Sequence, residues 1–231
     1  MLKWIALLLM IVDHIAYVIH DFIPFELYII MRGIGRLSFP VFVYYVVLGL
    51  GRTSNLKSYM LRLFAFAVFA EIAKRMFDIF QHSSLNVIFS LFIYGVIYML
   101  IEGRLGKLKI NNSFRYAIVA IILLTIIPYV EYNYAGFLIF ISLYYINKSS
   151  IKNKNLIAML AILLSFTPEM LLIDGVKIQW IAGFAGLLMF NKTLDSRIFS
   201  PKVEKWTFYW FYPIQWILLG LFYYLLLLPS S

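Results

Sequence analysis

Long apolar runs alternate with short polar connectors along almost the whole chain. A helix needs about 20 apolar residues to cross a bilayer. The runs therefore predict an all-α fold, a polytopic transmembrane helical bundle of about nine helices. The expected spans are residues 4–22, 26–50, 59–79, 85–101, 115–130, 134–147, 156–173, 177–191 and 206–228. Two of them, 134–147 and 177–191, are short, and we expect them to be tilted, re-entrant or only partly crossing.

The composition agrees with this pattern. Hydrophobic residues make up 63% of the chain and charged residues 13%, whereas a soluble chain is roughly half apolar and a quarter charged. Since the connectors are short, we interpret residues 1–231 as a single transmembrane domain. The chain has no cysteine, which excludes disulfides, thiolate metal ligands and a cysteine nucleophile. We expect no metal site.

The charge distribution predicts the orientation in the membrane. If Lys3 is inside, every second connector is cytoplasmic, and the positive-inside rule requires these connectors to be basic. They carry Arg52, Lys57, Arg104, Lys107, Lys109, Lys148, Lys152, Lys154, Lys192, Arg197, Lys202 and Lys205. We therefore place the N-terminus in the cytoplasm and the protein in the cell membrane. This topology explains the net charge of +9, so the charge does not indicate a nucleic-acid partner. The expected partner is the lipid bilayer.

Asp13 and His14 lie near the middle of the first apolar run, where an ionisable side chain costs about 2.5–3.5 kcal/mol. Adjacent helical residues point about 100° apart, so one structural partner does not satisfy both. His14 is the intramembrane group suited to act as a general base near neutral pH. Its alternative role is a hydrogen bond to a neighbouring helix. Asp13 is expected to orient such a helix or to pair with Arg36.

Arg32 and Arg36 are four residues apart in the second span and share one helical face. Gly33 and Gly35 between them allow a backbone or a ligand to approach closely. The arginines are either two ties between helices or a fork that binds phosphate or polarises a carbonyl. Pro40 is expected to loosen the helix below them.

Three further polar features occur near the ends of spans. Glu71 and Arg75 have the i,i+4 spacing of an ion pair. Asn86 opens the fourth span with an amide at its outer end. Residues 131–134 read Glu-Tyr-Asn-Tyr, a dense polar and aromatic rim before the sixth span.

Several of these features belong to a recognisable set of motifs. Residues 10–15 read MIVDHI and residues 32–42 read RGIGRLSFPVF; the others are LRL (61–63), LNVIFSL (85–91), EYNYAG (131–136) and YWFYPI (209–214). In this combination and order the chain resembles the TraX family, whose namesake acetylates the pilin of conjugative systems. It is similar, more distantly, to the larger group of multi-spanning transmembrane acyltransferases.

The resemblance implies an acyl-CoA-dependent O- or N-acetyltransferase in the membrane. It would take acetyl from cytoplasmic acetyl-CoA and pass it to a hydroxyl or amine at or beyond the membrane. His14 would be the base or a transient acyl carrier, with Asp13, Arg36 and Asn86 beside it. The sequence departs from the family pattern at Gln215, where a histidine is common, and at Glu131, where Asp is usual.

Other residues complete this hypothesis. Arg32, Arg52, Lys57 and Arg62 are expected to meet the phosphates of coenzyme A, and Glu71, Glu131 and Tyr134 to contact the acceptor. The acceptor is open between a protein N-terminus, a surface glycan and a lipid-linked intermediate. The alternative function is a small transporter or channel with an Asp/His/Arg polar path, although no repeat pair supports it. A purely structural role in an assembly complex would leave the intramembrane charges unused.

Overall fold

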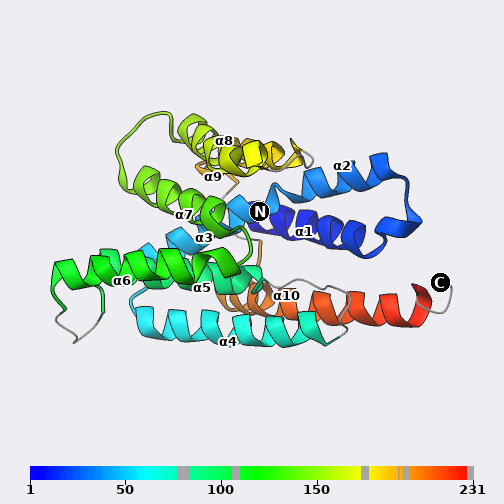
Figure 1. Ribbon diagram of the computed structural model, residues 1–231, viewed down its shortest axis with the longest axis horizontal. Coiled ribbons are helices and arrows are strands. Elements are labelled where there is room, and N and C mark those ends of the chain that lie inside the picture. Colours follow the sequence, from blue (N-terminus) through cyan, green and yellow to red (C-terminus); the bar gives the residue numbers. More distant parts are fainter. Residues whose placement is uncertain (77–83, 106–109, 173–176, 192, 195–197, 228–231) are drawn as a thin grey trace.

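The computed structural model describes residues 1–76, 84–105, 110–172, 177–191, 193–194 and 198–227 (Figure 1). This part of the chain is mostly helical and contains no strand, as the all-α prediction requires. Four of the basic residues expected in cytoplasmic connectors lie outside the described residues: Lys107, Lys109, Lys192 and Arg197.

The helices follow one another with short connectors. They are α1 (Leu2–Val18), α2 (Phe25–Gly35), α3 (Ser38–Arg52), α4 (Leu56–Arg75), α5 (Val87–Ile101), α6 (Asn112–Thr125), α7 (Asn133–Lys148), α8 (Lys154–Leu172), α9 (Gly186–Met189) and α10 (Pro201–Phe222). Short 3₁₀ turns follow α1 at His20–Phe22 and α6 at Ile127–Tyr129, and a longer 3₁₀ run, η3, covers Lys177–Ala185. A π-helical turn, Tyr223–Leu227, continues α10.

The expected single span 26–50 is two helices, α2 and α3, separated by a turn at Arg36 and Leu37. The physical reason is Pro40, in the first turn of α3, which has no N–H and whose ring clashes with the carbonyl of residue i−4 in a continuous helix. That carbonyl belongs to Arg36. The sequence-based prediction placed the disturbance below Arg36, but the helix breaks at Arg36 itself.

The structure also departs from the expected spans 177–191 and 206–228. The expected helix 177–191 is mostly 3₁₀, with only the short α9 at its end. Here Gly186 packs directly on α8, since a Cβ at Gly186 would lie 2.3 Å from the backbone N of Met159. The last helix begins at Pro201, before the expected residue 206, because the side chain of Ser200 caps it and Pro201 occupies its first turn.

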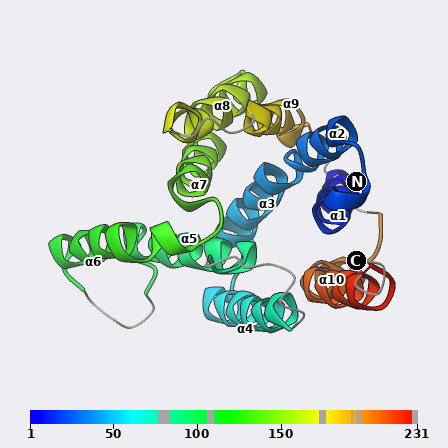
Figure 2. The ribbon, with the colours of Figure 1, turned by 45° about the vertical axis from the view of Figure 1, so that its right-hand side comes forward.

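Helix α3 is the central helix of the fold (Figure 2). It contacts α1, α5, α7, α9 and η3. Most of its side chains are buried, and they include Phe39, Val43, Val47 and Leu50. In the ribbon, α1 and α2 lie on one side of α3, α7 and α8 on another, and α4 runs beside α10 (Figures 1 and 2).

Two described segments are long and apolar enough to cross a membrane. They are Phe25–Arg52, which contains α2 and α3, and Asn112–Tyr129, which contains α6. Val87–Ile101, Lys154–Phe166 and Gln179–Met189 are shorter apolar helices. The α6 segment is mostly exposed and projects from the bundle (Figure 2). Large apolar side chains on its surface, such as Leu124 and Ile121, are exposed, which suits lipid and not water.

Candidate functional site

A cavity of about 230 Å³ collects most of the ionisable side chains expected inside the bundle. We call it the polar cavity. Its lining comes from α1, α2, α4, η3, α10 and the turns after α2 and before α7. It consists of Asp13, His14, Tyr17, Arg32, Arg36, Lys74, Glu131, Tyr132, Gln179 and Trp216. Segments far apart in the sequence therefore bring five predicted site residues together: Asp13, His14, Arg32, Arg36 and Glu131.

Asp13 and Arg32 form a buried ion pair between α1 and α2. Arg32 Nη1 lies 2.9 Å from Asp13 Oδ2 and 3.4 Å from the Asp13 carbonyl oxygen. Asp13 therefore orients a neighbouring helix, as one of the two expectations had it. The other expectation, a pair with Arg36, was wrong. Because α2 ends at Gly35, Arg36 lies in the turn after the helix and bonds elsewhere.

Gly35 sets how closely α1 and α2 approach. A Cβ at this position would lie 2.2 Å from the Cβ of Asp13. The sequence-based expectation of close approach is therefore confirmed for Gly35, which allows the α2 backbone to pack on Asp13 one turn from Arg32.

We expect Gly35→Ala to destabilise the protein by about 1–3 kcal/mol, the range for overpacking a filled interior. Thermal and denaturant unfolding of the detergent-purified protein would measure it. Gly51→Ala is the matched control, since a Cβ on Gly51 meets nothing within 4 Å and alanine favours helix. Equal stability of both variants would contradict the packing of Gly35 on Asp13.

His14 faces α10, away from the Asp13 ion pair. Its ring lies 4.5 Å from that of Trp216 and 5.7 Å from that of Tyr212, measured between centroids. Nδ1 is buried. Gln215 is close enough to interact with the ring, but neither Nδ1 nor the Gln215 amide makes a hydrogen bond of ordinary geometry. Asp13 and His14 thus have different partners, as their angular separation on the helix predicts.

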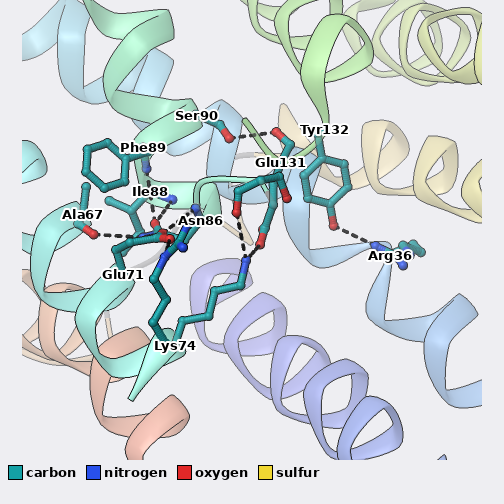
Figure 3. Close-up of polar contacts among 12 residues, drawn as sticks. Arg36, Ala67, Glu71, Lys74, Asn86, Ile88, Phe89, Ser90, Glu131 and Tyr132 are labelled. Atoms are coloured by element: carbon teal, nitrogen blue, oxygen red, sulfur yellow. Dashed lines mark hydrogen bonds and ion pairs between the residues drawn. The ribbon is translucent and has the colours of Figure 1, made fainter. Parts of the chain in front are cut away.

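The turn before α7 carries Glu131 and Tyr132 into the polar cavity, and α5 holds this turn in place. Ser90 Oγ donates to the Glu131 carbonyl at 2.7 Å (Figure 3). Tyr94 donates to the Asn133 carbonyl at 3.0 Å. Backbone bonds from Leu85 to Tyr129 and from Glu131 to Leu85 form a single bridge. The position of both cavity residues is therefore fixed by α5.

Tyr132 is held in a backbone conformation that non-glycine residues rarely adopt. Its φ is +60°, in the left-handed region, where a bulky residue signals strain. Its ring stacks on Phe39 with centroids 3.6 Å apart, and its hydroxyl accepts a hydrogen bond from Arg36 Nη1 at 3.0 Å (Figure 3). A strained backbone conformation of this kind persists only where contacts with the surrounding residues fix it, and such residues often occur at functional sites.

Lys74 is a cavity residue that the sequence analysis missed. Its Nζ lies 2.5 Å from Glu131 Oε1 and 3.4 Å from the Ser84 carbonyl oxygen. The side chain is buried, unlike that of its neighbour Arg75. The sequence did indicate that Lys74 is buried. This residue continues the spacing of three or four residues shared by the buried α4 residues Met60, Leu63, Ala67 and Ala70. A lysine on the apolar face of a helix predicts a buried partner.

A second cavity, of about 320 Å³, lies towards the N-terminal ends of α1 and α10. We call it the apolar cavity, because side chains such as Met10, Phe42, Leu63 and Phe208 make up most of its lining. Lys3, Glu204 and Lys205 add charge to the lining. Lys3 Nζ sits 4.4 Å from the centre of the Tyr45 ring.

Tyr212 lies between the two cavities. It lines the apolar cavity, and its ring packs against that of His14, which lines the polar cavity. Met10, another residue of the apolar cavity, precedes His14 by about one helical turn. His14 therefore lies between the apolar cavity, which Lys3 and Lys205 line, and the polar cavity, which Glu131 lines.

The family model for TraX protein matches residues 1–223. The chain belongs to the TraX family. No curated protein and no solved structure matches it.

Four of the six TraX-like motifs fall into two structural groups, and the other two, LRL and YWFYPI, contribute Leu63, Tyr209 and Tyr212 to the apolar cavity. MIVDHI and RGIGRLSFPVF supply the Asp13, His14, Arg32 and Arg36 side chains of the polar cavity, and EYNYAG supplies its turn. LNVIFSL has a structural position. Asn86 is fully buried, caps α5 by accepting from the Ile88 and Phe89 N–H groups, and donates to Ala67 and Glu71 (Figure 3).

Three residues predicted for catalysis or for the acceptor line neither cavity: Asn86, Glu71 and Tyr134. Glu71 pairs with Arg75, as the spacing predicted, and accepts from the Asn86 backbone N–H at 2.9 Å. Tyr134 is 45% exposed. The structure therefore brings Glu131 to the polar cavity but neither Glu71 nor Tyr134.

The residues expected to meet coenzyme A are divided between the two ends of the protein. Arg32 is at the polar cavity. Arg52 and Lys57 are exposed around the α3–α4 connector, and Arg62 interacts with Tyr209, which lines the apolar cavity. Lys3 and Lys205, which the sequence analysis treated only as topology signals, line that cavity directly.

Proposed function

We propose that the protein is a multi-pass membrane acetyltransferase that moves acetyl from cytoplasmic acetyl-CoA to a hydroxyl or amine at or beyond the membrane. The observation that carries this proposal is the position of His14: a partly buried imidazole, with Nδ1 fully buried, between a cavity suited to an acyl donor and a charged cavity suited to an acceptor. Family membership supports the same chemistry, since TraX is associated with pilin acetylation.

The multi-pass topology, with a cytoplasmic N-terminus in the cell membrane, is supported by charge and surface. The α3–α4 and α7–α8 connectors lie at one end of the ribbon, and the α1–α2 connector lies at the other (Figure 1). Arg52 and Lys57 flank the first of these connectors, and Lys152 lies in the second. Exposed apolar side chains occur on α1, α4, α8 and α10 as well as α6, among them Leu8, Ile72, Leu164 and Leu218.

The apolar cavity is the proposed donor site. A pantetheine arm is long and weakly polar, so it suits a space with mostly apolar walls. The phosphates of coenzyme A would remain outside the apolar part, beside Lys3 and Lys205. Arg62, Arg52 and Lys57 are further along the same end of the protein. This arrangement brings the thioester towards Tyr212 and His14.

The proposed chemical step uses His14 as a general base. An imidazole nitrogen takes the proton from the acceptor hydroxyl or amine, and the acceptor oxygen or nitrogen attacks the thioester carbonyl. The C–S bond then breaks, and the same proton passes to the departing thiolate to give free coenzyme A. Transfer through an acetyl-imidazole on His14 is the alternative route. In both, charge develops on the carbonyl oxygen close to the cations of the polar cavity.

The test is binding of acetyl-CoA to the detergent-purified protein, measured by calorimetry, followed by release of free coenzyme A. We expect binding and slow acetyl transfer to water. A folded protein that does not bind acetyl-CoA would overturn the proposal. Counterflow of a solute in liposomes would then favour the transporter interpretation.

We expect the double variant Lys3→Gln/Lys205→Gln to bind acetyl-CoA about 10-fold or more weakly, because a hydrogen bond to a charged group contributes about 1.5–3 kcal/mol. Affinity for acetyl-pantetheine, which lacks the phosphates, should not change. Lys152→Gln, in an exposed connector, is the control. If Arg52→Gln/Lys57→Gln weakens binding and the first variant does not, the phosphates dock at the α3–α4 connector instead.

A further inference from the structure

The polar cavity carries more positive than negative side chains. Among the described residues that line it, Arg32, Arg36 and Lys74 are cationic, and Asp13 and Glu131 are carboxylates. Arg32 is paired with Asp13 and Lys74 with Glu131. Three cations minus two carboxylates leave one positive charge, and that charge belongs to Arg36.

Arg36 has a hydrogen-bond partner but no carboxylate partner in the described part of the chain. A guanidinium has five N–H donors, and here Nη1 donates to the Tyr132 hydroxyl. Its carbon also lies 5.9 Å from the centre of the Tyr132 ring. Neither contact neutralises the charge. The carboxylates of Asp13 and Glu131 act on this partly buried charge only from a distance, because each already pairs with another cation, so an anion that entered the cavity would pair with it directly.

The same cavity offers hydrogen-bond acceptors that the protein leaves unused. Asp13 Oδ1 and Gln179 Oε1 are both buried, and neither has a hydrogen-bond partner in the described residues. Buried acceptors normally have one. A ligand that supplied an O–H or N–H to these atoms, next to His14, would satisfy them.

We propose that the polar cavity binds a small group that joins an anion, carboxylate or phosphate, to a nearby hydroxyl or amine, with the anion on Arg36. Identification of this group as the acetyl acceptor rests on the proposed function; the binding itself does not. The cavity volume of about 230 Å³ is below the roughly 300–1,000 Å³ of sites for drug-sized ligands. It therefore takes the headgroup of an acceptor, not a folded chain.

A permanent anion suits Arg36 better than a role limited to the transition state. An oxyanion exists only during the reaction, so it would leave the guanidinium uncompensated between turnovers. The planar fork of arginine also matches the two oxygens of a carboxylate or phosphate. Tyr132 accepts a hydrogen bond from Arg36 and is itself stacked on Phe39, so the site is formed before the ligand arrives.

The first experiment measures ligand binding without acetyl-CoA. Thermal unfolding of the detergent-purified protein is followed with glucuronate against glucose, and with glycerol 3-phosphate against glycerol. We expect at least one anionic probe to raise the unfolding temperature, with an affinity at least 10-fold above that of its neutral partner. Preference for only one of the two anions would identify the group. No preference in either pair would overturn the proposal.

Variants then locate the site. Arg36→Gln should abolish the preference for the anion, and Arg36→Lys should retain part of it. Arg75→Gln is the matched control, since Arg75 is an exposed arginine of α4 outside the cavity, and it should bind the anion like the wild type. If Arg36→Gln does not fold, the wild-type comparison still decides. Unchanged selectivity in folded Arg36→Gln would overturn the assignment to Arg36.

Adding acetyl-CoA separates this proposal from the proposed function. Acetylated glucuronate or glycerol 3-phosphate, detected by mass spectrometry and lost in Arg36→Gln, would support both. Anion binding without acetyl transfer, in a protein that does not bind acetyl-CoA, would support the site and reject the acetyltransferase. Transfer to neutral and anionic probes at equal rates would support the acetyltransferase and reject the anion site.

Discussion

His14→Ala should lower the rate of acetyl transfer from acetyl-CoA by about 10²–10⁴-fold, the usual contribution of a positioned acid or base. Binding of acetyl-CoA should change little, because the proposed phosphate contacts are at Lys3 and Lys205, at the other end of the apolar cavity. Release of coenzyme A over time, measured with a thiol reagent on the purified protein, gives the rate. Calorimetry gives the affinity.

His20→Ala is the matched control for that experiment. His20 follows α1, where its ring is exposed and its Nδ1 bonds with the Tyr17 carbonyl oxygen at 3.0 Å. It lines neither cavity, so its removal should leave the transfer rate at the wild-type level. A His14→Ala protein that binds acetyl-CoA and transfers acetyl at the wild-type rate would exclude His14 from the chemistry.

Residues of the polar cavity could be predicted from the sequence where they interrupt an apolar run. Asp13, His14 and Arg32 occur where lipid-facing residues are expected, so they had to point into the bundle. Helical geometry then separated Asp13 from His14 correctly. Lys74 obeys the same rule, but it follows an alanine-rich stretch of α4 near the predicted end of a span, where a lysine reads as an interface residue.

Other parts of the site depend on contacts that no local pattern encodes. The position of Tyr132 comes from a left-handed turn anchored by Ser90 and Tyr94 of α5. The choice of Arg32 over Arg36 as the partner of Asp13 follows from the helix break that Pro40 imposes and from the contact at Gly35. Both features depend on packing between helices that are distant in sequence.

The ion pair of Asp13 and Arg32 should give the largest effect on stability. Its side chains are only 10% and 14% exposed. Arg32→Gln leaves the Asp13 carboxylate buried without its cation, and breaking a buried pair in this way costs about 3–5 kcal/mol. Asp13→Asn/Arg32→Gln should recover much of the loss, because no unpaired charge then remains between α1 and α2.

Arg75→Gln provides the scale for this comparison. Arg75 is 58% exposed in its pair with Glu71, and an exposed pair is worth about 0–1 kcal/mol. Denaturant unfolding of these three variants and the wild type in one detergent measures both pairs by the same method. If Arg32→Gln lowers the free energy of unfolding no more than Arg75→Gln does, water must reach Asp13. The closed contact of α1 and α2 at Gly35 would then be wrong.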